Sequence, residues 1–445
     1  MAIITEHWGI IGGGMLGLAL AQKLQAAGQI VTVIEAAPQL GGLAAAWELG
    51  GVTWDKHYHV ILLSDFHVHK LLKDIGLESE FVGVETKTGF YTEGKLYSMS
   101  NSLEFLRFPP LGLIAKLRLG MTIFRASKIK NWKALEKLSV VDWLTRWSGR
   151  STFQKIWLPL LRAKLGDSYK IASAAFIWAI IARMYAARRS GLKKEMFGYV
   201  RGGYARIIGR FANQLNDKGV EFRTATAVDR VDSNGGGLVQ VELRNGGTLE
   251  FDKVIVTAAT PLASKLIPGL TPEEHARLNG ITYQGIVCAS VLLKKPLDRF
   301  YVTNITDDWV PFTAVIEMSA LVDRTEFGGH CLVYLPKYVA SDDPLFDETD
   351  QSIRERFLSA LTKMYPHFNL DDVLAFRVSR VRNVFAVSTL NYSEMVPPFT
   401  TSLPGVYLVN SSQILNGTLN VNETLMLAEQ ALPTLLNQPA LSGVS

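Results

Sequence analysis

Two histidines that flank a tyrosine are the first residues with the chemistry of a functional site. They are His57 and His59 in the stretch VTWDKHYHV, and His67 and His69 follow closely. Imidazole can ligate a metal, transfer a proton or serve as a structural hydrogen-bonding group. A metal site needs a third converging ligand, usually a carboxylate or thiolate, and no such spacing accompanies this stretch. We therefore expect no metal site, and the catalytic and structural interpretations of His59 stay open.

A glycine pattern near the N-terminus, Gly12-x-Gly14-x-x-Gly17, has the chemistry of phosphate binding. Gly12 permits a tight turn, Gly14 lets a pyrophosphate approach the backbone, and Gly17 lets a helix pack on a strand. Glu35, 21 residues after Gly14, can accept hydrogen bonds from a ribose. These residues predict a dinucleotide site.

The elements that must position this motif are predicted in the required order. A strand-like run over residues 8–11 precedes the glycines, a helix runs to Gly28, and a second strand covers residues 30–34. The N-terminus of that helix offers unpaired N–H groups to phosphate oxygens. The motif is specific because strand, glycines, helix, strand and acid follow one another.

The stretch EAAPQLGGLAAAW extends the pattern, because a glycine pair follows Glu35 after a short spacer. Together these motifs resemble the FAD-binding members of the flavin amine oxidase, phytoene desaturase and protoporphyrinogen oxidase superfamily. The resemblance implies FAD as the cofactor, with the glycine pair against its diphosphate and ribityl part. Many members have Arg after the pair, where this chain has Leu43. The residues expected to hold FAD on this side are Gly12, Gly14, Met15, Leu16, Gly17, Glu35, Ala36, Gly41, Gly42 and Leu43.

Residues 196–232 resemble the second FAD-binding segment of that superfamily, with a glycine pair, an amphipathic helix and a strand. Gly202 and Gly203 match the pair, and Val228 matches a valine that meets the adenine end of FAD. A hairpin is then predicted to turn at Asn245-Gly246, and a buried strand leads to Ala258, which is also expected at the cofactor.

The last segment resembles the part of the superfamily that approaches the flavin. A buried strand, residues 406–409, ends in Asn410 where the family has Gly-Asp. Asparagine can hydrogen-bond as aspartate does but carries no charge. Asn420, Asn422 and Thr424 stand where the next helix begins, and its N–H groups would stabilise negative charge on a reduced flavin. We expect all four side chains to contact FAD.

The predicted fold class is α/β, with a Rossmann-like FAD-binding domain and an inserted mixed α+β substrate domain. The FAD-binding domain is expected to be discontinuous and to comprise residues 1–90, 196–275 and 398–445. The substrate domain is expected to comprise residues 91–195, a basic helical part, and residues 276–397, an antiparallel sheet with a helix near 350–364.

Charge is distributed unevenly along the chain. Residues 107–194 hold 19 Lys and Arg against three acids, a net of +16 in a protein of net charge +5. The same block contains runs such as AAFIWAIIA, which are too apolar for a merely solvated face. A solvated basic surface, a membrane surface along residues 105–194 and an anionic substrate are the alternatives. Nucleic acid is not expected, because no recognition module accompanies the charge.

The sequence also indicates the cellular compartment in which we expect the protein. The longest apolar run is shorter than the roughly 20 residues that cross a bilayer. Cys288 and Cys331 cannot build a disulfide framework, and the N-terminus lacks the pattern of a secretion signal. We expect a cytoplasmic protein, with peripheral attachment to the inner face of the membrane as an option; the oligomeric state is not set.

For function, the resemblance implies an FAD-dependent oxidoreductase in which hydride passes from a substrate carbon to flavin N5 and oxygen or a quinone reoxidises the flavin. The substrate is expected to be hydrophobic or anionic, either isoprenoid or amine-like. A UDP-galactopyranose mutase-like enzyme acting on a nucleotide sugar and a non-catalytic flavin-binding subunit are the alternatives. His59 is the catalytic candidate, since the family often has a histidine there, close to the flavin. The substrate-binding candidates are His57, Arg162, Tyr199, Gly202 and Gly203, joined by Lys164, Trp178, Tyr185, Lys193, Lys194 and Arg201.

Overall fold

The first sheet of the molecule is parallel and has the order β10-β2-β1-β14-β20. The computed structural model describes residues 5–188, 196–233, 237–415 and 417–437. The predicted strand, helix, strand order around the glycine motif is confirmed. The strands of this sheet are β1 (His7–Ile11), β2 (Ile30–Ile34), β10 (Glu221–Arg223), β14 (Lys253–Val256) and β20 (Val406–Leu408).

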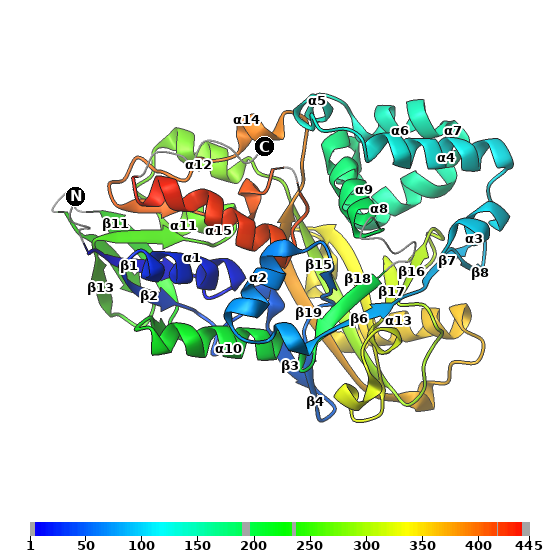
Figure 1. Ribbon diagram of the computed structural model, residues 1–445, viewed down its shortest axis with the longest axis horizontal. Helices are drawn as coiled ribbons and strands as arrows, with labels where there is room; N and C mark the ends of the chain where they lie inside the picture. The colour runs from blue at the N-terminus through cyan, green and yellow to red at the C-terminus, as the bar shows by residue number, and fades with distance from the viewer. Residues whose placement is uncertain (1–4, 189–195, 234–236, 416, 438–445) are drawn as a thin grey trace.

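Two different layers cover the faces of this sheet (Figure 1). Helices α1 (Met15–Ala26), α2 (Phe66–Asp74), α10 (Gly203–Asp217) and α15 (Val421–Leu435) share one apolar core with it. The other face packs against a small antiparallel sheet and two short helices. Those elements are β11 (Val228–Ser233), β12 (Val239–Leu243), β13 (Thr248–Phe251), α11 (Thr260–Leu266) and α12 (Pro272–Asn279). The predicted hairpin at Asn245-Gly246 is the β12–β13 turn.

A seven-stranded sheet of order β19-β15-β18-β17-β16-β7-β8 forms the second half of the molecule. Its neighbouring strands are antiparallel except for β16 and β7, which run parallel. Helix α13 covers one face, at the predicted position Asp350–Met364. The strands are β7 (Thr88–Thr92), β8 (Lys95–Ser98), β15 (Tyr283–Leu293), β16 (Val302–Ile305), β17 (Ala314–Glu317), β18 (Cys331–Ala340) and β19 (Val373–Ala386).

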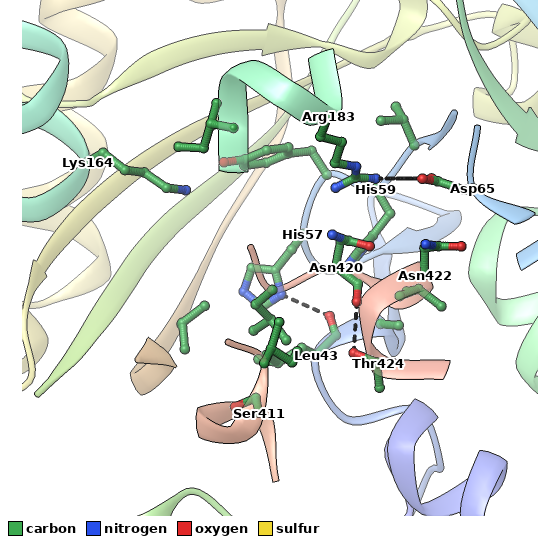
Figure 2. A pocket seen from close by; sticks show the side chains of 18 of the residues that line it. Leu43, His57, His59, Asp65, Lys164, Arg183, Ser411, Asn420, Asn422 and Thr424 are labelled. Atoms are coloured by element: carbon green, nitrogen blue, oxygen red, sulfur yellow. Dashed lines mark hydrogen bonds and ion pairs between the residues drawn. The ribbon is translucent and has the colours of Figure 1, made fainter. Parts of the chain in front are cut away.

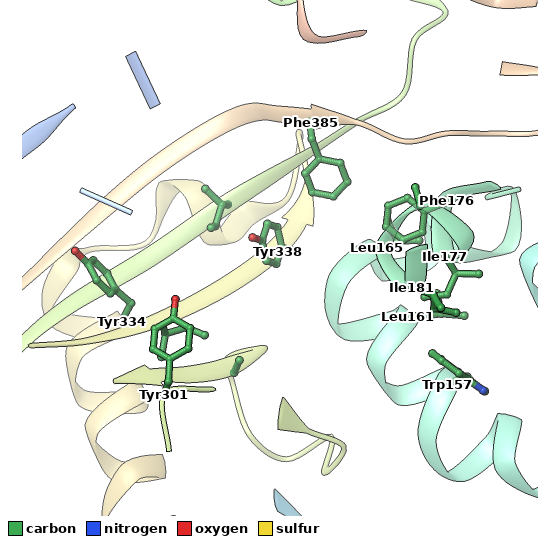
Figure 3. Close-up of a cluster of buried hydrophobic side chains, with 14 of the residues drawn as sticks. Trp157, Leu161, Leu165, Phe176, Ile177, Ile181, Tyr301, Tyr334, Tyr338 and Phe385 are labelled. Carbon is green, nitrogen blue, oxygen red and sulfur yellow. The ribbon is translucent and has the colours of Figure 1, made fainter. Parts of the chain in front are cut away.

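A group of helices between residues 102 and 188, called the cap here, packs on the other face of the seven-stranded sheet. Its helices are α3 (Ser102–Arg107), α4 (Leu113–Ala126), α5 (Lys133–Glu136), α6 (Val140–Ser148), α7 (Arg150–Thr152), α8 (Leu158–Leu165) and α9 (Ala174–Arg188). Figure 3 shows α8 and α9 opposite the sheet strands, with apolar side chains between them. No described helix combines the length and the apolar character that a membrane crossing requires.

The histidine stretch departs from its predicted structure. A strand-like run over residues 52–63 would suggest one continuous strand, but the chain forms a hairpin, β3 (Ala46–Leu49) with β4 (Val52–Asp55). It then leaves strand geometry until β5 (Ile61–Leu62). The short sheet β5-β9-β6 follows, with β6 at Phe81–Glu85 and β9 at Met196–Val200. His57 and His59 therefore lie in a loop. The proposed domain boundary at residue 90 falls inside β7, which pairs with the seven-stranded sheet.

Candidate active site

A cavity of about 870 Å³ lies between the first sheet, the seven-stranded sheet and the cap. This volume is within the range of small-molecule sites. Residues from the glycine loops, the histidine loop and the start of α15 line one side, which we call the main-chain wall. Residues from α4, α8, α9 and the seven-stranded sheet line the other, which we call the side-chain wall.

At several glycines of the two loops, an added side chain would contact the backbone too closely. A Cβ on Gly17 would lie 1.9 Å from the carbonyl oxygen of Gly12, whose own φ is +115°. Gly41 donates its N–H to the carbonyl oxygen of Gly13 at 2.8 Å and forms a bridge with Gly14. A Cβ on Gly42 would lie 3.2 Å from the Cα of Gly14. The two glycine loops therefore lie against each other, and their backbone is left bare.

Glu35 sits where the ribose-binding acid of a dinucleotide site is expected. Its carboxylate accepts the N–H groups of Gly13 at 2.7 Å and Ala37 at 2.8 Å. The segment before β11 lies beside it, because Ala225 N–H donates to Ala37 O and Thr226 N–H donates to Glu35 O, both at 2.9 Å. Glu35, Ala36 and the segment leading to Val228 are thus neighbours although nearly 200 residues apart.

The start of α15 faces the cavity. Asn420 is its N-cap and accepts the Glu423 N–H at 3.0 Å, and Asn420, Asn422 and Thr424 all line the cavity, as Figure 2 shows. Asn410 is fully buried; its Oδ1 accepts from Ser412, and its Nδ2 has no partner within the described residues. A buried donor without a partner favours a ligand or water at that point.

His57 and His59 line the cavity as neutral side chains. The Nδ1–H of His57 donates to the carbonyl oxygen of Leu43 at 3.2 Å, and its Nε2 lies 3.1 Å from Ser379 Oγ. Burial lowers the pKa of His57, and burial followed by the repulsion of His57 lowers the pKa of His59 to about 3. Asp55, whose Oδ2 is 3.8 Å from His59 Nδ1, has its pKa raised to about 8 by burial.

The side-chain wall is mainly apolar, with one polar corner. The ammonium of Lys164 lies 3.6 Å from the ring centroid of Tyr338, and burial lowers the pKa of Lys164 to about 7. The Tyr338 hydroxyl is 2.6 Å from the hydroxyl of Tyr58, so the two share a hydrogen bond. The other cation of the described lining, Arg183, pairs with Asp65 at 3.0 Å.

The structure places only some of the predicted substrate-binding residues at the cavity. Of these, His57, Lys164 and Tyr185 line the cavity, as does the catalytic candidate His59. Another six do not line it: Arg162, Trp178, Tyr199, Arg201, Gly202 and Gly203. Arg162 is exposed, with its guanidinium carbon 5.7 Å from the Tyr169 ring centroid. Tyr199 accepts the Asp323 N–H, and Gly202 donates to Glu326. Lys193 and Lys194 are outside the described residues.

Half of the predicted cofactor residues line the cavity, among them Asn420, Asn422 and Thr424 at the start of α15. Gly14, Met15, Leu16, Gly41 and Leu43 line the cavity, and Thr257 and Ala259 line it on either side of Ala258. Their contacts with a cofactor stay predictions. Sequence reasoning missed polar residues on both sides of the cavity. They are Asp55, Tyr58 and Asp65 in or beside the histidine loop, and Arg183, Tyr338 and Asn383 of the side-chain wall. Tyr58 alone carried a signal, since it lies between the two histidines.

Comparisons with known proteins match this architecture. The model of the flavin-containing amine oxidoreductase family matches residues 16–420. The chain belongs to this family. Membership confirms the predicted resemblance, FAD as the cofactor and the class of FAD-dependent oxidoreductase.

Curated relatives are distant. The chain is 27% identical over 145 residues to protoporphyrinogen oxidase 2 of Arabidopsis thaliana, covering 31% of this chain and 28% of that one. It is 23% identical to coproporphyrinogen III oxidase of Mycobacterium tuberculosis, covering 60% and 62%, and 24% identical to hydroxysqualene dehydroxylase of Zymomonas mobilis, covering 68% and 72%. The matches thus span less than two thirds of the first two relatives.

Solved structures share the whole fold. A triple mutant of putrescine oxidase superposes with a TM-score of 0.76 at 15% identity, over 97% of this chain and 99% of that one. Reduced UDP-galactopyranose mutase superposes with a TM-score of 0.73 at 15% identity, over 97% and 96%. At such identities the likeness shows the fold alone, and it confirms the predicted α/β class.

The residues on the main-chain wall fit FAD. Gly14 and Gly41 line the cavity without side chains, which leaves room for a diphosphate beside their backbone. Gly17 lets α1 lie close to the loop at Gly12, where a Cβ would displace the backbone. Glu35 is placed for a ribose, and the unpartnered Nδ2 of Asn410 can donate to an oxygen of the cofactor. Leu43, where many members have Arg, offers its carbonyl to His57 and no cation to the phosphates.

Proposed function

We propose that the protein oxidises an apolar substrate by removing a hydride from one of its carbons, in a desaturation or dehydrogenation. Bound FAD supplies the acceptor at flavin N5 and is reoxidised by oxygen or a quinone. The observation that carries this proposal is the cavity itself, in which the glycine loops and the α15 start meet an apolar wall. An isoprenoid or amine-like compound fits that chemistry, and the relative named hydroxysqualene dehydroxylase supports the isoprenoid class.

In this proposal the protein binds, orients and excludes water. The N–H groups at the start of α15 stabilise negative charge on the side of the cavity they face. Aromatic and aliphatic side chains of the opposite wall, among them Trp157, Ile181 and Tyr301, hold the apolar substrate. His59, with a pKa of about 3, stays neutral at physiological pH and is a weak base. We therefore assign it a positioning role.

The described lining favours oxidation over the mutase-like alternative. A nucleotide sugar brings a diphosphate with at least two negative charges, which needs several cations. Of the two cations in the described lining, Arg183 is already paired with Asp65, so Lys164 alone has no paired carboxylate. Membership in an oxidoreductase family favours an enzyme over a non-catalytic subunit.

Anaerobic reduction tests the proposal. Purified FAD-loaded protein is mixed with candidate apolar substrates, and flavin absorbance near 450 nm is followed. Bleaching by a polyprenoid or apolar amine, with a dehydrogenated product in mass spectrometry, is the expected result. A flavin that stays oxidised with all of them, yet supports isomerisation of a nucleotide sugar once reduced with dithionite, would replace the proposal with the mutase.

We also propose that the cap docks on an anionic membrane. Five exposed apolar side chains follow one face of α4, and two more come from α3: Leu113, Ile114, Leu117, Met121 and Phe124, with Leu103 and Leu106. Exposed cations lie along the same segment: Arg107, Arg118, Arg125, Lys128 and Lys130. An apolar stripe with flanking cations is the pattern of an interfacial helix. Ile123 of the same helix lines the cavity, so a substrate dissolved in lipid would enter nearby.

Sedimentation with vesicles tests the docking surface. Wild type should bind vesicles that contain anionic phosphatidylglycerol, and the double variant Ile114→Gln, Leu117→Gln should lose most of that binding, since each buried apolar side chain contributes about 1.5–3 kcal/mol. The matched control, Leu262→Gln with Leu370→Gln, changes two exposed leucines outside the cap. Equal binding of both double variants, or no dependence on anionic lipid, would contradict the proposal.

A further inference from the structure

Lys164 is an unusual residue for a largely apolar wall. It comes from α8 and lines the cavity together with Trp157, Ile177 and Tyr338. In the part of the chain that the structure describes, no carboxylate lies within 4.0 Å of its ammonium, whereas Arg183 pairs with Asp65. Figure 2 shows Lys164 and Asn422 projecting from opposite sides of the cavity. A cation thus stands at the end of the cavity away from the start of α15.

The position of this ammonium is fixed by its surroundings. It lies 3.6 Å from the ring centroid of Tyr338 and 5.1 Å from that of Phe385. Tyr338 is itself held by the 2.6 Å hydrogen bond to Tyr58, and Thr313 Oγ1 donates to the carbonyl of Ala163 at 2.9 Å, which ties α8 to the sheet. A site whose side chains are held in place binds a ligand with little loss of conformational freedom.

Two other polar side chains lie near this end of the cavity. One lines the cavity, and the other is buried without a hydrogen-bond partner among the described residues. Asn383 of β19 lines the cavity. Gln284 of β15 is fully buried, and neither atom of its amide has a partner among the described residues. Its Nε2 lies 3.5 Å from where a Cβ on Gly166 would be, two residues beyond Lys164. Buried polar groups are rarely left unpaired without water or a ligand.

Charge balance identifies the ligand class. A cation enclosed by aromatic rings is costly unless an anion compensates it. One ammonium balances one negative charge, so a carboxylate fits. A phosphate monoester carries nearly two negative charges, and close to one of them would stay buried without a compensating cation. We propose that Lys164 binds a carboxylate of the substrate, whose apolar remainder lies along the side-chain wall toward α15. The inference rests on the proposed function and narrows its substrate to an apolar carboxylic acid.

Calorimetry of the FAD-loaded protein with three C10 probes tests this assignment. Decanoate should bind wild type at least about tenfold tighter than decan-1-ol. Lys164→Met should abolish that preference, because it removes the one cation of the described lining that has no paired carboxylate. Lys164→Arg should retain part of the preference. Lys170→Met, which removes an exposed cation already paired with Asp167, is the matched control and should bind as wild type does.

The outcomes separate this inference from the proposed function. Unchanged decanoate preference in Lys164→Met, or in Lys164→Gln if the first variant does not fold, overturns the assignment. Decyl phosphate binding tighter than decanoate overturns the choice of carboxylate. Calorimetry reads binding whether or not the flavin is reduced, so decanoate binding that depends on Lys164, combined with a flavin that no apolar compound reduces, would overturn the proposed function alone.

Discussion

The two walls of the cavity are built from different parts of the chain. The main-chain wall presents glycine backbone and the N-terminal turn of a helix, supplied by short local motifs around Gly14, Gly41 and Asn420. The side-chain wall presents Trp157, Lys164, Tyr338 and others, from elements far apart in sequence. Backbone surfaces bind groups that are common to many ligands, such as phosphates, while side chains can be exchanged without altering the fold. From this difference we propose that the main-chain wall holds the cofactor and that the side-chain wall selects the substrate.

The largest effect should come from adding one methyl group to α1, where it would press on the glycine loop of the main-chain wall. Gly17→Ala places a Cβ 1.9 Å from the Gly12 carbonyl oxygen, so α1 or the glycine loop must shift. We expect a stability loss of about 2–3 kcal/mol, and FAD affinity lowered more than about tenfold, which corresponds to 1.4 kcal/mol. Flavin content after purification and a titration with FAD measure both.

The matched control is Gly209→Ala, the same exchange within α10. Gly209 is exposed, and no atom lies within 4 Å of its added Cβ. Here the exchange should leave FAD binding unchanged and raise stability by up to about 1 kcal/mol. If Gly17→Ala bound FAD as well as this control does, the main-chain wall would not be the cofactor side.

An intermediate effect is expected at Asp55, which connects α10 to β18 of the seven-stranded sheet. Its Oδ1 accepts the Tyr204 N–H at the start of α10, and its carbonyl accepts a hydrogen bond from the Tyr334 hydroxyl of β18. Burial raises the pKa of Asp55 from 3.8 to about 8. Between about pH 4 and pH 8 the Asp55 carboxyl is protonated in the folded protein and ionised in the unfolded chain. The contribution of this group to the free energy of unfolding is therefore fully present below about pH 4 and is lost as the pH rises to about 8.

Asp55→Asn should remove that pH dependence, because the amide keeps the acceptor and carries no charge. We expect the melting temperature of wild type to fall relative to the variant as the pH rises from 4 to 8, and the two to stay parallel above pH 8. Thermal melts across this range provide the measurement. A wild type that becomes more stable than Asp55→Asn with rising pH would show that the carboxylate is ionised and paired in the folded state.

The contrast between the walls also explains what the sequence could reveal. The glycine spacing, Glu35 and the helix at Asp350–Met364 follow from local patterns, and the structure has them where expected. On α8 the sequence analysis chose Arg162 as a substrate-binding residue and named Lys164 beside it, but of the two only Lys164 lines the cavity. A π-helical turn, Phe153–Trp157, precedes α8 and rotates its faces relative to a regular helix, which periodicity does not register.

Contacts between side chains on opposite sides of the cavity could not be predicted from the sequence, for a related reason. Tyr58 and Tyr338 are 280 residues apart, and their hydroxyls meet because the loop after β4 packs against β18. No local pattern encodes such a pair; the packing of the cap and both sheets decides it. The same holds for Asp65 and Arg183, which come from α2's start and α9.

The smallest effect should follow from removing one hydroxyl from the side-chain wall. Tyr338→Phe leaves the ring under the Lys164 ammonium but takes away the partner of Tyr58, at a cost of about 1–3 kcal/mol if Tyr58 finds no water. FAD content should stay at the wild-type level, because Tyr338 belongs to the wall opposite the glycine loops.

The double variant Tyr58→Phe, Tyr338→Phe should regain part of the lost stability, since neither ring then carries an unpaired hydroxyl. Chemical denaturation of the wild type, the two single variants Tyr58→Phe and Tyr338→Phe, and the double variant gives the coupling energy between the two residues. A coupling near zero would mean that the hydroxyl pair is not held in solution, and a fall in FAD content would mean that the two walls do not divide cofactor and substrate between them.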